Sequence, residues 1–505
     1  MKLVREGAFA LGVGVVVMVA ACSSRNAYQC SSAEQCVLSG EPGTCEPEGF
    51  CSFPDPSCPN GQRFEPHAGN GLGGQCSVTP PVDAPSVDAP PVPCGTVGLA
   101  CCANELDPPC ATGLSCTSGT CEACVQDVGL GKRFACFVKR DHTVWCSGDD
   151  DLGQLGNGLT SVTPTATPVQ VTDATGPITD ATDVETTEFS ACAIRAGGAV
   201  WCWGRGTLGT LGNNAATTQS SAVRVVKAGD VPLDTIVELA GGWNHMCARD
   251  GNLGVWCWGR DASGQLGDGL VAQRNFAAPV LDAPGGAPLT GAMQLVSGGD
   301  HACVRKANDE IWCWGGNFAG QFGDTTTANH GSPVKIATSR SVAGGSYSTC
   351  WVNADTSVSC TGANYHGNLG IGTGGSFSGA DEHAPKSVVT ALGGPPFMGA
   401  VEVAAGSAMA CARTQDGHVW CWGDNNYGQT GTGAGNAVPG LVLTRVGTSI
   451  VPLANVDALN AHFPHVCAHT TDRGWLCWGR NRDGELGDGS FINPTFATPL
   501  SLTCP

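Results

Sequence analysis

One spacing recurs through most of this chain: two cysteines 10 positions apart, repeated seven times. The seven pairs are Cys136 and Cys146, Cys192 and Cys202, Cys247 and Cys257, Cys303 and Cys313, Cys350 and Cys360, Cys411 and Cys421, and Cys467 and Cys477. The second cysteine usually lies within Val-Trp-Cys-Trp-Gly, and a Gly-Gln-Leu-Gly-like turn follows it. Self-similarity at a nearly fixed interval indicates a repeat architecture in which each copy is one supersecondary unit.

The second copy, residues 192–202, shows what one unit predicts. Two short apolar runs flank Ala196-Gly197-Gly198, which is typical of a β-hairpin with a three-residue turn in which glycine supplies the positive φ. In that register Cys192 lies directly opposite Cys202, close enough for a disulfide. We therefore predict one disulfide within each of the seven hairpins.

The tryptophans beside the second cysteine are predicted to pack between sheets. Trp201 and Trp203 flank Cys202, so both side chains point to the face opposite the cysteine. Because most copies repeat the pattern, we interpret these rings as core rather than as ligand-stacking residues. The fifth copy, Ser357–Gly362, lacks both tryptophans. In the turn that follows, the single leucine is expected to fill the core while the glycines supply special backbone conformations.

Three histidines, His245, His301 and His465, share the position two residues before the first cysteine of their copies. Such residues could meet near a central axis and bind a metal. A buried histidine needs only one partner for each ring nitrogen, so we expect hydrogen bonds within each repeat instead. The run Asp149–Asp151 lacks the alternating oxygen ligands of a calcium loop. No metal and no cofactor is predicted.

These elements resemble the regulator-of-chromosome-condensation repeat in its bacterial form, over residues 124–504. The resemblance implies a seven-bladed β-propeller of four-stranded blades, the fold that also includes the secreted β-lactamase inhibitor protein II. The function of the family does not transfer, because its eukaryotic member acts on a nuclear GTPase and chromatin, and an acidic exported lipoprotein would meet neither. Circular closure requires the two ends to meet, and Cys124 and Cys504 remain once the other cysteines are assigned. We therefore expect a disulfide between them.

The N-terminus predicts export and lipid attachment. Lys2 and Arg5 precede the apolar stretch Ala8–Ala21, which has the length of a signal-peptide core and is short for a membrane span. Residues 1–22 end in Val-Ala-Ala-Cys22, which resembles the bacterial lipobox, whose cysteine is lipidated. More than one acyl chain on Cys22 would give stable attachment. We expect an exported lipoprotein of the cell envelope, at the outer membrane or cell surface.

Two small cysteine-rich modules are predicted between the anchor and the repeats. Residues 30–76 and 94–123 each contain six cysteines and few large apolar residues, so disulfides rather than a core would hold them. The second resembles a knottin-type framework, while residues 77–93 are Pro-rich and predict a semi-rigid linker. The expected fold is all-β: a seven-bladed propeller over residues 124–505, preceded by two disulfide-rich modules.

Charge and motifs limit the function. A net charge of -19 with 25 Lys and Arg residues and no basic stripe argues against nucleic acid. The chain has no recognisable Ser/His/Asp arrangement, zinc-binding helix or phosphate loop, so no catalytic residue is predicted. We expect a non-enzymatic scaffold for an unidentified protein partner, with recognition carried by Thr160–Glu188 and Thr373–Pro396.

Two further functions remain open from the sequence. Polysaccharide binding is the alternative, through loop aromatics such as Trp243, Tyr347 and Tyr365. An enzyme with its site in the propeller channel is the third hypothesis, because residues far apart in sequence can converge in a fold.

Overall fold

The computed structural model describes residues 120–500 apart from 374–380, 434–437 and 447–450, together with residue 502 and six short strands before residue 120. The chain divides into two units, Met1–Pro90 and Pro91–Pro505. Apart from the short strands, the predicted linker and modules lie outside the described residues, as does Cys22, so they stay predictions.

The first unit contributes five of the short strands. They are β1 (Val37–Leu38), β2 (Glu41–Pro42), β3 (Thr44–Cys45), β4 (Cys51–Pro54) and β5 (Gln62–Phe64). β1 pairs with β2, and β3, β4 and β5 form a second small sheet. The second unit begins with the hairpin of β6 (Leu114–Thr117) and β7 (Thr120–Ala123).

Seven antiparallel sheets, each built on four consecutive strands, follow in the second unit. Blade 1 is β8 (Val125–Leu130), β9 (Phe134–Lys139), β10 (Val144–Asp150) and β11 (Ser161–Gln170). Blade 2 is β14 (Ala181–Thr186), β15 (Ser190–Arg195), β16 (Ala199–Gly204) and β17 (Gln219–Arg224). Blade 3 is β20 (Ile236–Gly241), β21 (His245–Asp250), β22 (Val255–Gly259) and β23 (Arg274–Pro279). Blade 4 is β24 (Ala292–Ser297), β25 (His301–Lys306), β26 (Glu310–Gly315) and β27 (His330–Thr338).

The remaining blades repeat this order. Blade 5 is β28 (Ser341–Gly344), β29 (Ser348–Val352), β30 (Val358–Gly362) and β31 (Glu382–Ser387). Blade 6 is β32 (Ala400–Ala405), β33 (Met409–Thr414), β34 (Val419–Gly423) and β35 (Val438–Leu443). Blade 7 is β36 (Val456–His462), β37 (His465–Thr470), β38 (Gly474–Gly479) and β39 (Thr498–Pro499). Small additions are β12 (Thr172–Asp173) with β13 (Gly176–Pro177), and β18 (Val226–Lys227) with β19 (Val231–Pro232), which extends blade 3.

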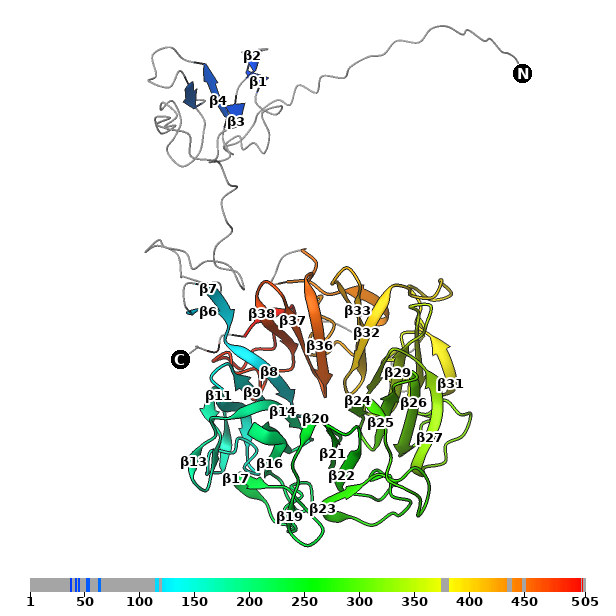
Figure 1. Cartoon of the computed structure of the whole chain (residues 1–505). Coiled ribbons are helices and arrows are strands. Elements are labelled where there is room, and N and C mark those ends of the chain that lie inside the picture. The colour runs from blue at the N-terminus through cyan, green and yellow to red at the C-terminus, as the bar shows by residue number, and fades with distance from the viewer. Residues whose placement is uncertain are drawn as a thin grey trace, which may run out of the picture. The chain divides into compact units, whose positions relative to one another are not determined.

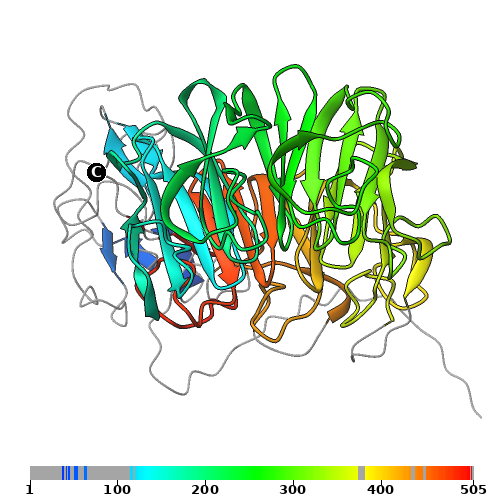
Figure 2. The same cartoon turned by 90° about the horizontal axis from the view of Figure 1, so that it is seen from below.

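The blades form a ring, which confirms the predicted seven-bladed propeller. The first strand of each blade faces the central axis and the fourth lies at the periphery (Figure 1). Viewed edge-on, the strands run between two faces of the ring (Figure 2). We call the face that carries the turns between the first and second strands the loop face. The opposite face, which carries the turns between the second and third strands, is the hairpin face.

The seven predicted disulfides are all present. In each hairpin the two cysteines are register partners, and their Cα atoms lie 4.0 or 4.1 Å apart. In blade 2 the turn is the three residues Ala196–Gly198, a single 3₁₀ turn (η2) in which Gly197 has φ 79° and Gly198 φ 77°. The sequence prediction of hairpin, register and turn is therefore confirmed.

The second tryptophan of the repeat joins each blade to the one before it. In five blades this ring is completely buried, and its Nε1–H donates to a backbone carbonyl in the glycine turn of the preceding blade at 2.8–2.9 Å. These rings are Trp203, Trp258, Trp314, Trp422 and Trp478. The predicted packing role of the tryptophans is confirmed, and each ring also supplies a hydrogen bond between neighbouring blades.

The two blades without this tryptophan place a hydroxyl group beside a carbonyl in the glycine turn of the preceding blade, and in blade 5 that hydroxyl also lies 2.8 Å from the Glu382 carbonyl of its own blade. In blade 1 the Ser147 hydroxyl donates to the Glu485 carbonyl of blade 7 at 2.9 Å. In blade 5 the Thr361 hydroxyl lies 2.9 Å from the Gly320 carbonyl of blade 4. The sequence exceptions therefore replace a large donor with a small one, and the ring of contacts stays complete.

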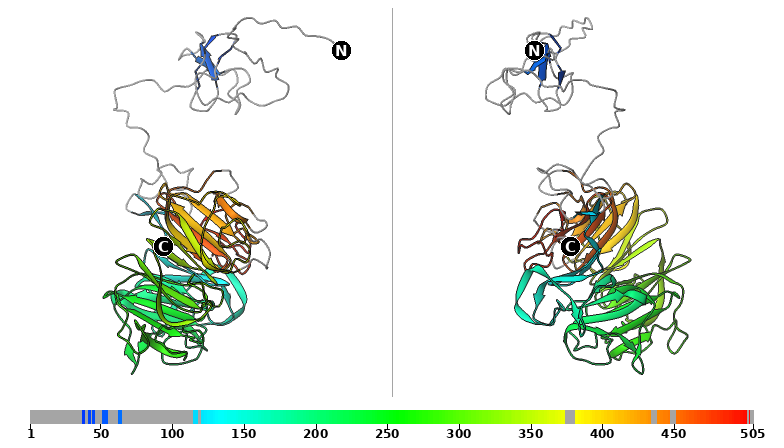
Figure 3. Two further views of the ribbon diagram at one scale, coloured as in Figure 1. Left: turned by 90° about the vertical axis from the view of Figure 1, so that its right-hand side faces the viewer. Right: turned by 60° about the vertical axis from the view of Figure 1, so that its left-hand side comes forward.

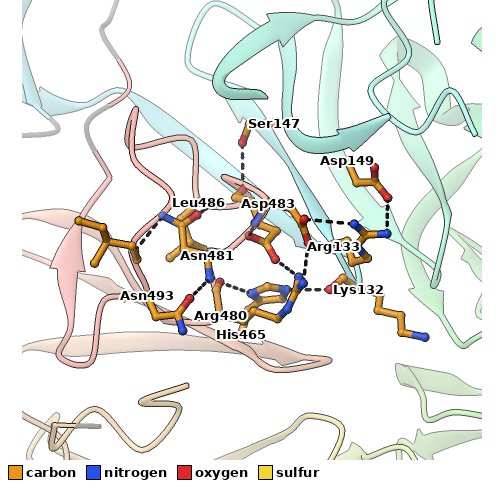
Figure 4. A network of polar contacts seen from close by, with 12 residues as sticks. Lys132, Arg133, Ser147, Asp149, His465, Arg480, Asn481, Asp483, Leu486 and Asn493 are labelled. Atoms are coloured by element: carbon orange, nitrogen blue, oxygen red, sulfur yellow. Dashed lines mark hydrogen bonds and ion pairs between the residues drawn. The ribbon is translucent and has the colours of Figure 1, made fainter. Parts of the chain in front are cut away.

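Blades 7 and 1 close the ring through side chains (Figure 4). Arg133 of blade 1 forms a two-pronged ion pair with Asp483 of blade 7, at 3.0 and 3.1 Å, and pairs with Asp149 as well. On the axis side, Asn460 donates to the Val128 carbonyl at 2.7 Å. The adjoining first and last blades, cyan and red, are seen from two other directions in Figure 3. Among the described strands, each blade is made of its own consecutive strands and none is exchanged across this junction.

The structure describes only one of the two cysteines of the predicted closing disulfide. Cys124 is buried and disulfide-bonded. Its predicted partner, Cys504, lies outside the described residues, so the Cys124–Cys504 pairing stays a prediction.

The three equivalent histidines are buried, and their expected bonding is partly wrong. His301 Nε2 lies 3.0 Å from the Thr349 hydroxyl of the next blade rather than from a group in its own blade. Only His465 keeps a partner in its own repeat, with Nδ1 2.9 Å from the Arg480 carbonyl oxygen. Neither ring nitrogen of His245 has a hydrogen-bond partner among the described residues. His245 lacks such a partner because the next blade has Ala302 at the position equivalent to Thr349, the partner of His301. Burial lowers the pKa of His245 to about 3.

Candidate functional site

Seven equivalent residues surround the axis on the loop face. Each lies two positions before the second strand of its blade, within the turn from the first strand. We call this set the mouth ring: Lys132, Glu188, Trp243, Gly299, Ser346, Ser407 and Phe463. The framework residues of the repeat are the same in most blades, whereas the mouth ring has six residue types at seven positions. A blade-specific position on a repeated frame is where recognition of an asymmetric ligand can be built.

The mouth ring opens into a hollow of about 530 Å³. Six of its seven members line this mouth hollow, joined by Tyr347, Tyr365, His366 and Ala408. The volume falls within the range of small-ligand sites, which typically combine aromatic and polar side chains in their lining. Four of the ten lining residues here are Trp, Tyr or Phe.

Four aromatic rings form one cluster on one side of the hollow. Tyr347 is the centre: its ring centroid lies 4.8 Å from Trp243, 5.2 Å from Phe318 and 6.3 Å from Tyr365, all in edge-to-face geometry. Edge-to-face pairs are favoured by the ring quadrupoles and fix the orientation of each ring. Burial raises the pKa of the Tyr347 hydroxyl, and nearby Asp300 raises it further, so Tyr347 remains a hydrogen-bond donor at neutral pH.

Backbone hydrogen bonds between the turns of neighbouring blades fix the positions of the mouth-ring residues. The Glu188 N–H donates to the Trp243 carbonyl at 3.1 Å, and the Trp243 N–H donates to the Gly299 carbonyl at 2.8 Å. Further round, the Ser407 N–H donates to the Phe463 carbonyl at 2.9 Å. Gly299 must lack a side chain, because a Cβ there would lie 2.8 Å from the Trp243 ring. The lining is therefore preorganised by its own backbone.

Charges at the mouth are balanced in pairs. Lys132 forms an ion pair with Glu188, with side chains 46% and 18% exposed. Beside the aromatic cluster, Arg260 pairs with the buried Asp300 at 3.1 Å. Because each cation faces an anion, the mouth carries little net charge although the whole chain is strongly acidic.

Below the mouth, several polar side chains of the first strands connect neighbouring blades. Asp127 accepts from the Val184 N–H at 2.8 Å, and Glu402 accepts from the Leu459 N–H at 3.2 Å, each bond reaching the next blade. The first strands are not paired with one another, so these carboxylates satisfy backbone groups that would otherwise be open. Burial raises the pKa of Glu185 to about 8, and a nearby Asp127 adds to this. The channel carboxylates thus have structural partners, and we assign no catalytic role to them.

The structure brings together three aromatics that the sequence singled out separately. Trp243, Tyr347 and Tyr365 all line the mouth hollow. Sequence reasoning missed the rest of the site, including Lys132, Glu188 and Phe463. The sequence did contain a signal for these residues. Two residues before the second strand, every blade has a turn, but only two of the seven blades share a residue type there.

The two segments expected to carry recognition are mostly framework. Thr160–Glu188 contains β11, the β12–β13 hairpin and β14, and only its last residue reaches the mouth ring. Thr373–Pro396 contains β31, while residues 374–380 lie outside the description. Thr160–Glu188 therefore builds the outer strand of blade 1 and the inner strand of blade 2 rather than one long loop. That this segment carries recognition stays a prediction.

Within the described residues, no group of three or more His, Cys, Asp and Glu side chains is arranged to hold a metal ion. The described part of the chain also has no helix that is long and apolar enough to cross a membrane.

Comparison with known proteins supports the repeat. The regulator of chromosome condensation (RCC1) repeat family matches residues 294–321 and 400–429, which fall in the fourth and sixth copies. The human E3 ubiquitin-protein ligase HERC2 is 25% identical over 358 residues, which cover 69% of this chain and 7% of HERC2. The ultraviolet-B receptor UVR8 of Arabidopsis thaliana is 26% identical over 325 residues, covering 62% of this chain and 68% of UVR8. The chain therefore has RCC1-like relatives.

A solved structure supports the architecture. Human WBSCR16 aligns with a TM-score of 0.58 at 17% sequence identity, covering 71% of this chain and 93% of that protein. At this identity the likeness shows the shared fold alone.

Proposed function

We propose that this chain is a non-enzymatic scaffold of the bacterial cell envelope that presents the loop face of its propeller to a protein partner. The mouth ring carries the proposal: on a frame of nearly identical blades, the side chains that differ from blade to blade converge on one face. A frame with one disulfide in each hairpin keeps these side chains in fixed positions.

Residue types on the loop face favour a protein partner. Phe318 is 48% exposed beside the mouth. Two pairs of an aromatic ring and an arginine lie on other blades: Arg205 lies 5.5 Å from the Phe189 ring centroid, and Arg482 lies 5.1 Å from that of Tyr427. Aromatic and arginine side chains are enriched among the residues that dominate binding energy at protein interfaces.

Attachment to the envelope rests on the N-terminal sequence. The proposed lipid on Cys22 and the two cysteine-rich modules would hold the propeller away from the membrane, at the outer membrane or cell surface. The abundance of disulfides supports an oxidising compartment of this kind. The envelope location is a proposal, and so is the resemblance to propellers of the β-lactamase inhibitor protein II type. HERC2 contributes only the likeness of its repeats, since the matched stretch is a small part of it.

The test is site-specific photo-crosslinking of the full chain in its native cells. A photoreactive phenylalanine replaces Phe318 on the loop face or, as the matched control in the same blade, the exposed Ala307 in the hairpin-face turn. We expect a discrete protein adduct from position 318 and none from position 307. Equal adducts from both positions, or adducts from 307 alone, would refute the loop-face proposal.

A further inference from the structure

We propose that the mouth hollow is a carbohydrate-binding site that takes a neutral pyranose unit of a glycan. This capacity goes beyond the proposed protein contact, because it assigns a second class of ligand, a glycan, to the hollow that the mouth ring surrounds. Three groups of observations carry it: the aromatic cluster, the polar groups facing it, and the rigid backbone that holds both.

The aromatic cluster supplies a platform of the kind that sugar rings pack against. Pyranose rings have apolar C–H faces, which pack on aromatic side chains with a gain similar to other apolar contacts. Trp243 and Tyr347 lie at right angles, 88° between planes, so they offer two walls rather than one flat surface. Tyr365 adds a third ring that also lines the hollow. Two aromatic rings at right angles restrict the position of a sugar ring in two directions.

Polar groups at the rim match the hydroxyl groups of a sugar. The Lys132 ammonium donates, the Glu188 carboxylate accepts, and the hydroxyl groups of Ser346 and Ser407 can do either. All four line the same hollow as the aromatic rings. Hydrogen bonds to charged groups are stronger than neutral ones, so the Lys132–Glu188 pair would discriminate among the directions of neighbouring sugar hydroxyls.

The balance of charge selects a neutral ligand. Lys132 and Glu188 form an ion pair with each other, and Asp300 is held by Arg260 and Gln265. An anionic ligand such as a phosphate would compete with Glu188 for Lys132, and a quaternary ammonium would meet the Lys132 cation. A neutral sugar can bond to both members of the pair without separating them.

The site needs little rearrangement to bind. The backbone bonds of Trp243 and Ser407 to the next turns fix the walls, and Gly299 leaves room for the Trp243 ring to lie against the backbone. Binding to preorganised groups avoids the entropy cost of ordering them. The hollow of about 530 Å³ lies in the range of sites for ligands larger than one sugar unit, so short oligosaccharides are suitable probes.

The test is isothermal titration of the full chain with four neutral trisaccharides: maltotriose, cellotriose, mannotriose and tri-N-acetylchitotriose. Each is supplied to about 10 mM, tenfold above a Kd of about 1 mM. We expect saturable binding of at least one of them. Trp243→Ala and Tyr347→Ala should each weaken it about tenfold, while Tyr347→Phe should retain most of it because the ring remains.

Controls separate this inference from the proposed function. Tyr427→Ala removes a loop-face aromatic outside the hollow and should leave sugar affinity unchanged, and near-ultraviolet circular dichroism reports whether each variant is folded. Absence of binding for all four trisaccharides overturns the inference, as does affinity unchanged in folded Trp243→Ala. Neither result depends on the photo-crosslink from position 318, which tests the proposed protein contact alone.

Discussion

Gly267 and Gly285 allow the inter-blade tryptophan contact to be measured against a matched control. Both have nearly the same left-handed backbone, with φ of 68° and 69°. A Cβ at Gly267 would lie 2.8 Å from the Trp314 ring, whereas a Cβ at Gly285 would have nothing within 4 Å. Alanine in this conformation costs roughly 1–2 kcal/mol at either site. A Cβ at Gly267 would also lie 2.8 Å from Val280 Cγ1. The difference between Gly267→Ala and Gly285→Ala therefore reports the packing of Trp314 and Val280 against this glycine.

The expected difference follows from what Trp314 would lose. Its Nε1–H donates to the Gln265 carbonyl at 2.9 Å inside the blade 3–blade 4 interface. Overpacking a core costs about 1–3 kcal/mol, and leaving a buried polar group unsatisfied costs about the same. We expect Gly267→Ala to lower the free energy of unfolding by about 2–6 kcal/mol more than Gly285→Ala does.

Guanidinium unfolding of the oxidised chain, followed by tryptophan fluorescence, provides the measurement. The two variants and the parent are compared at equal slope, because a change in slope would signal a different unfolding transition. If both glycine variants lose the same stability within about 0.5 kcal/mol, the inter-blade role assigned to the tryptophan and its glycine is wrong.

Three further predictions follow from the fold and the N-terminus. Thr361→Val should lower the free energy of unfolding by about 1–3 kcal/mol, because the Thr361 hydroxyl lies within hydrogen-bond distance of the Gly320 and Glu382 carbonyls and a valine can donate to neither; an unchanged denaturation midpoint would contradict this. The folded pKa of Glu185 is about 8 and its usual value 4.5, so stability should fall as pH rises from 4.5 to 8, by up to about 1.4 kcal/mol per pH unit. Glu185→Gln should flatten that dependence in pH-series melts, and an unaltered slope would exclude Glu185 as its source. Cys22→Ala should abolish incorporation of labelled fatty acid and release the chain from membranes, and persistent labelling would refute the lipobox.

The sequence predicted the parts of the fold that depend on spacing within one repeat. A cysteine pair 10 residues apart with Gly, Asp or Asn in the turn between them specifies the hairpin, its register and its disulfide without reference to any other blade. The alternation of Trp201 and Trp203 about Cys202 likewise specified the face that they cover. Closure of the ring at seven blades followed from the number of copies.

What could not be predicted depends on contacts between blades. The sequence shows that Ser147 and Thr361 interrupt the tryptophan pattern, but their hydroxyls are recognised as substitutes only when the carbonyl of the preceding blade is placed beside them. The error for His301 has the same origin, since its partner Thr349 belongs to the next blade.

The candidate site was predicted in part for a similar reason. Loop aromatics are visible in a sequence, and Trp243 and Tyr347 were singled out on that basis. They lie far apart in the chain and come from different turns, so only the ring brings them to a centroid distance of 4.8 Å. Lys132 and Glu188 are ordinary surface charges by sequence and acquire a role from their place on the axis.

Hydrogen–deuterium exchange of the full chain, alone and with the partner recovered by crosslinking, tests the central claim most directly. The claim is that blade-specific residues on the loop face form the binding site. We predict slower exchange on binding in the loop-face turns, including residues 131–133, 187–189, 242–244 and 345–347, with no change in the hairpin-face turns such as 251–254 and 307–309. Protection confined to the hairpin face, or spread equally over both faces, would contradict the account.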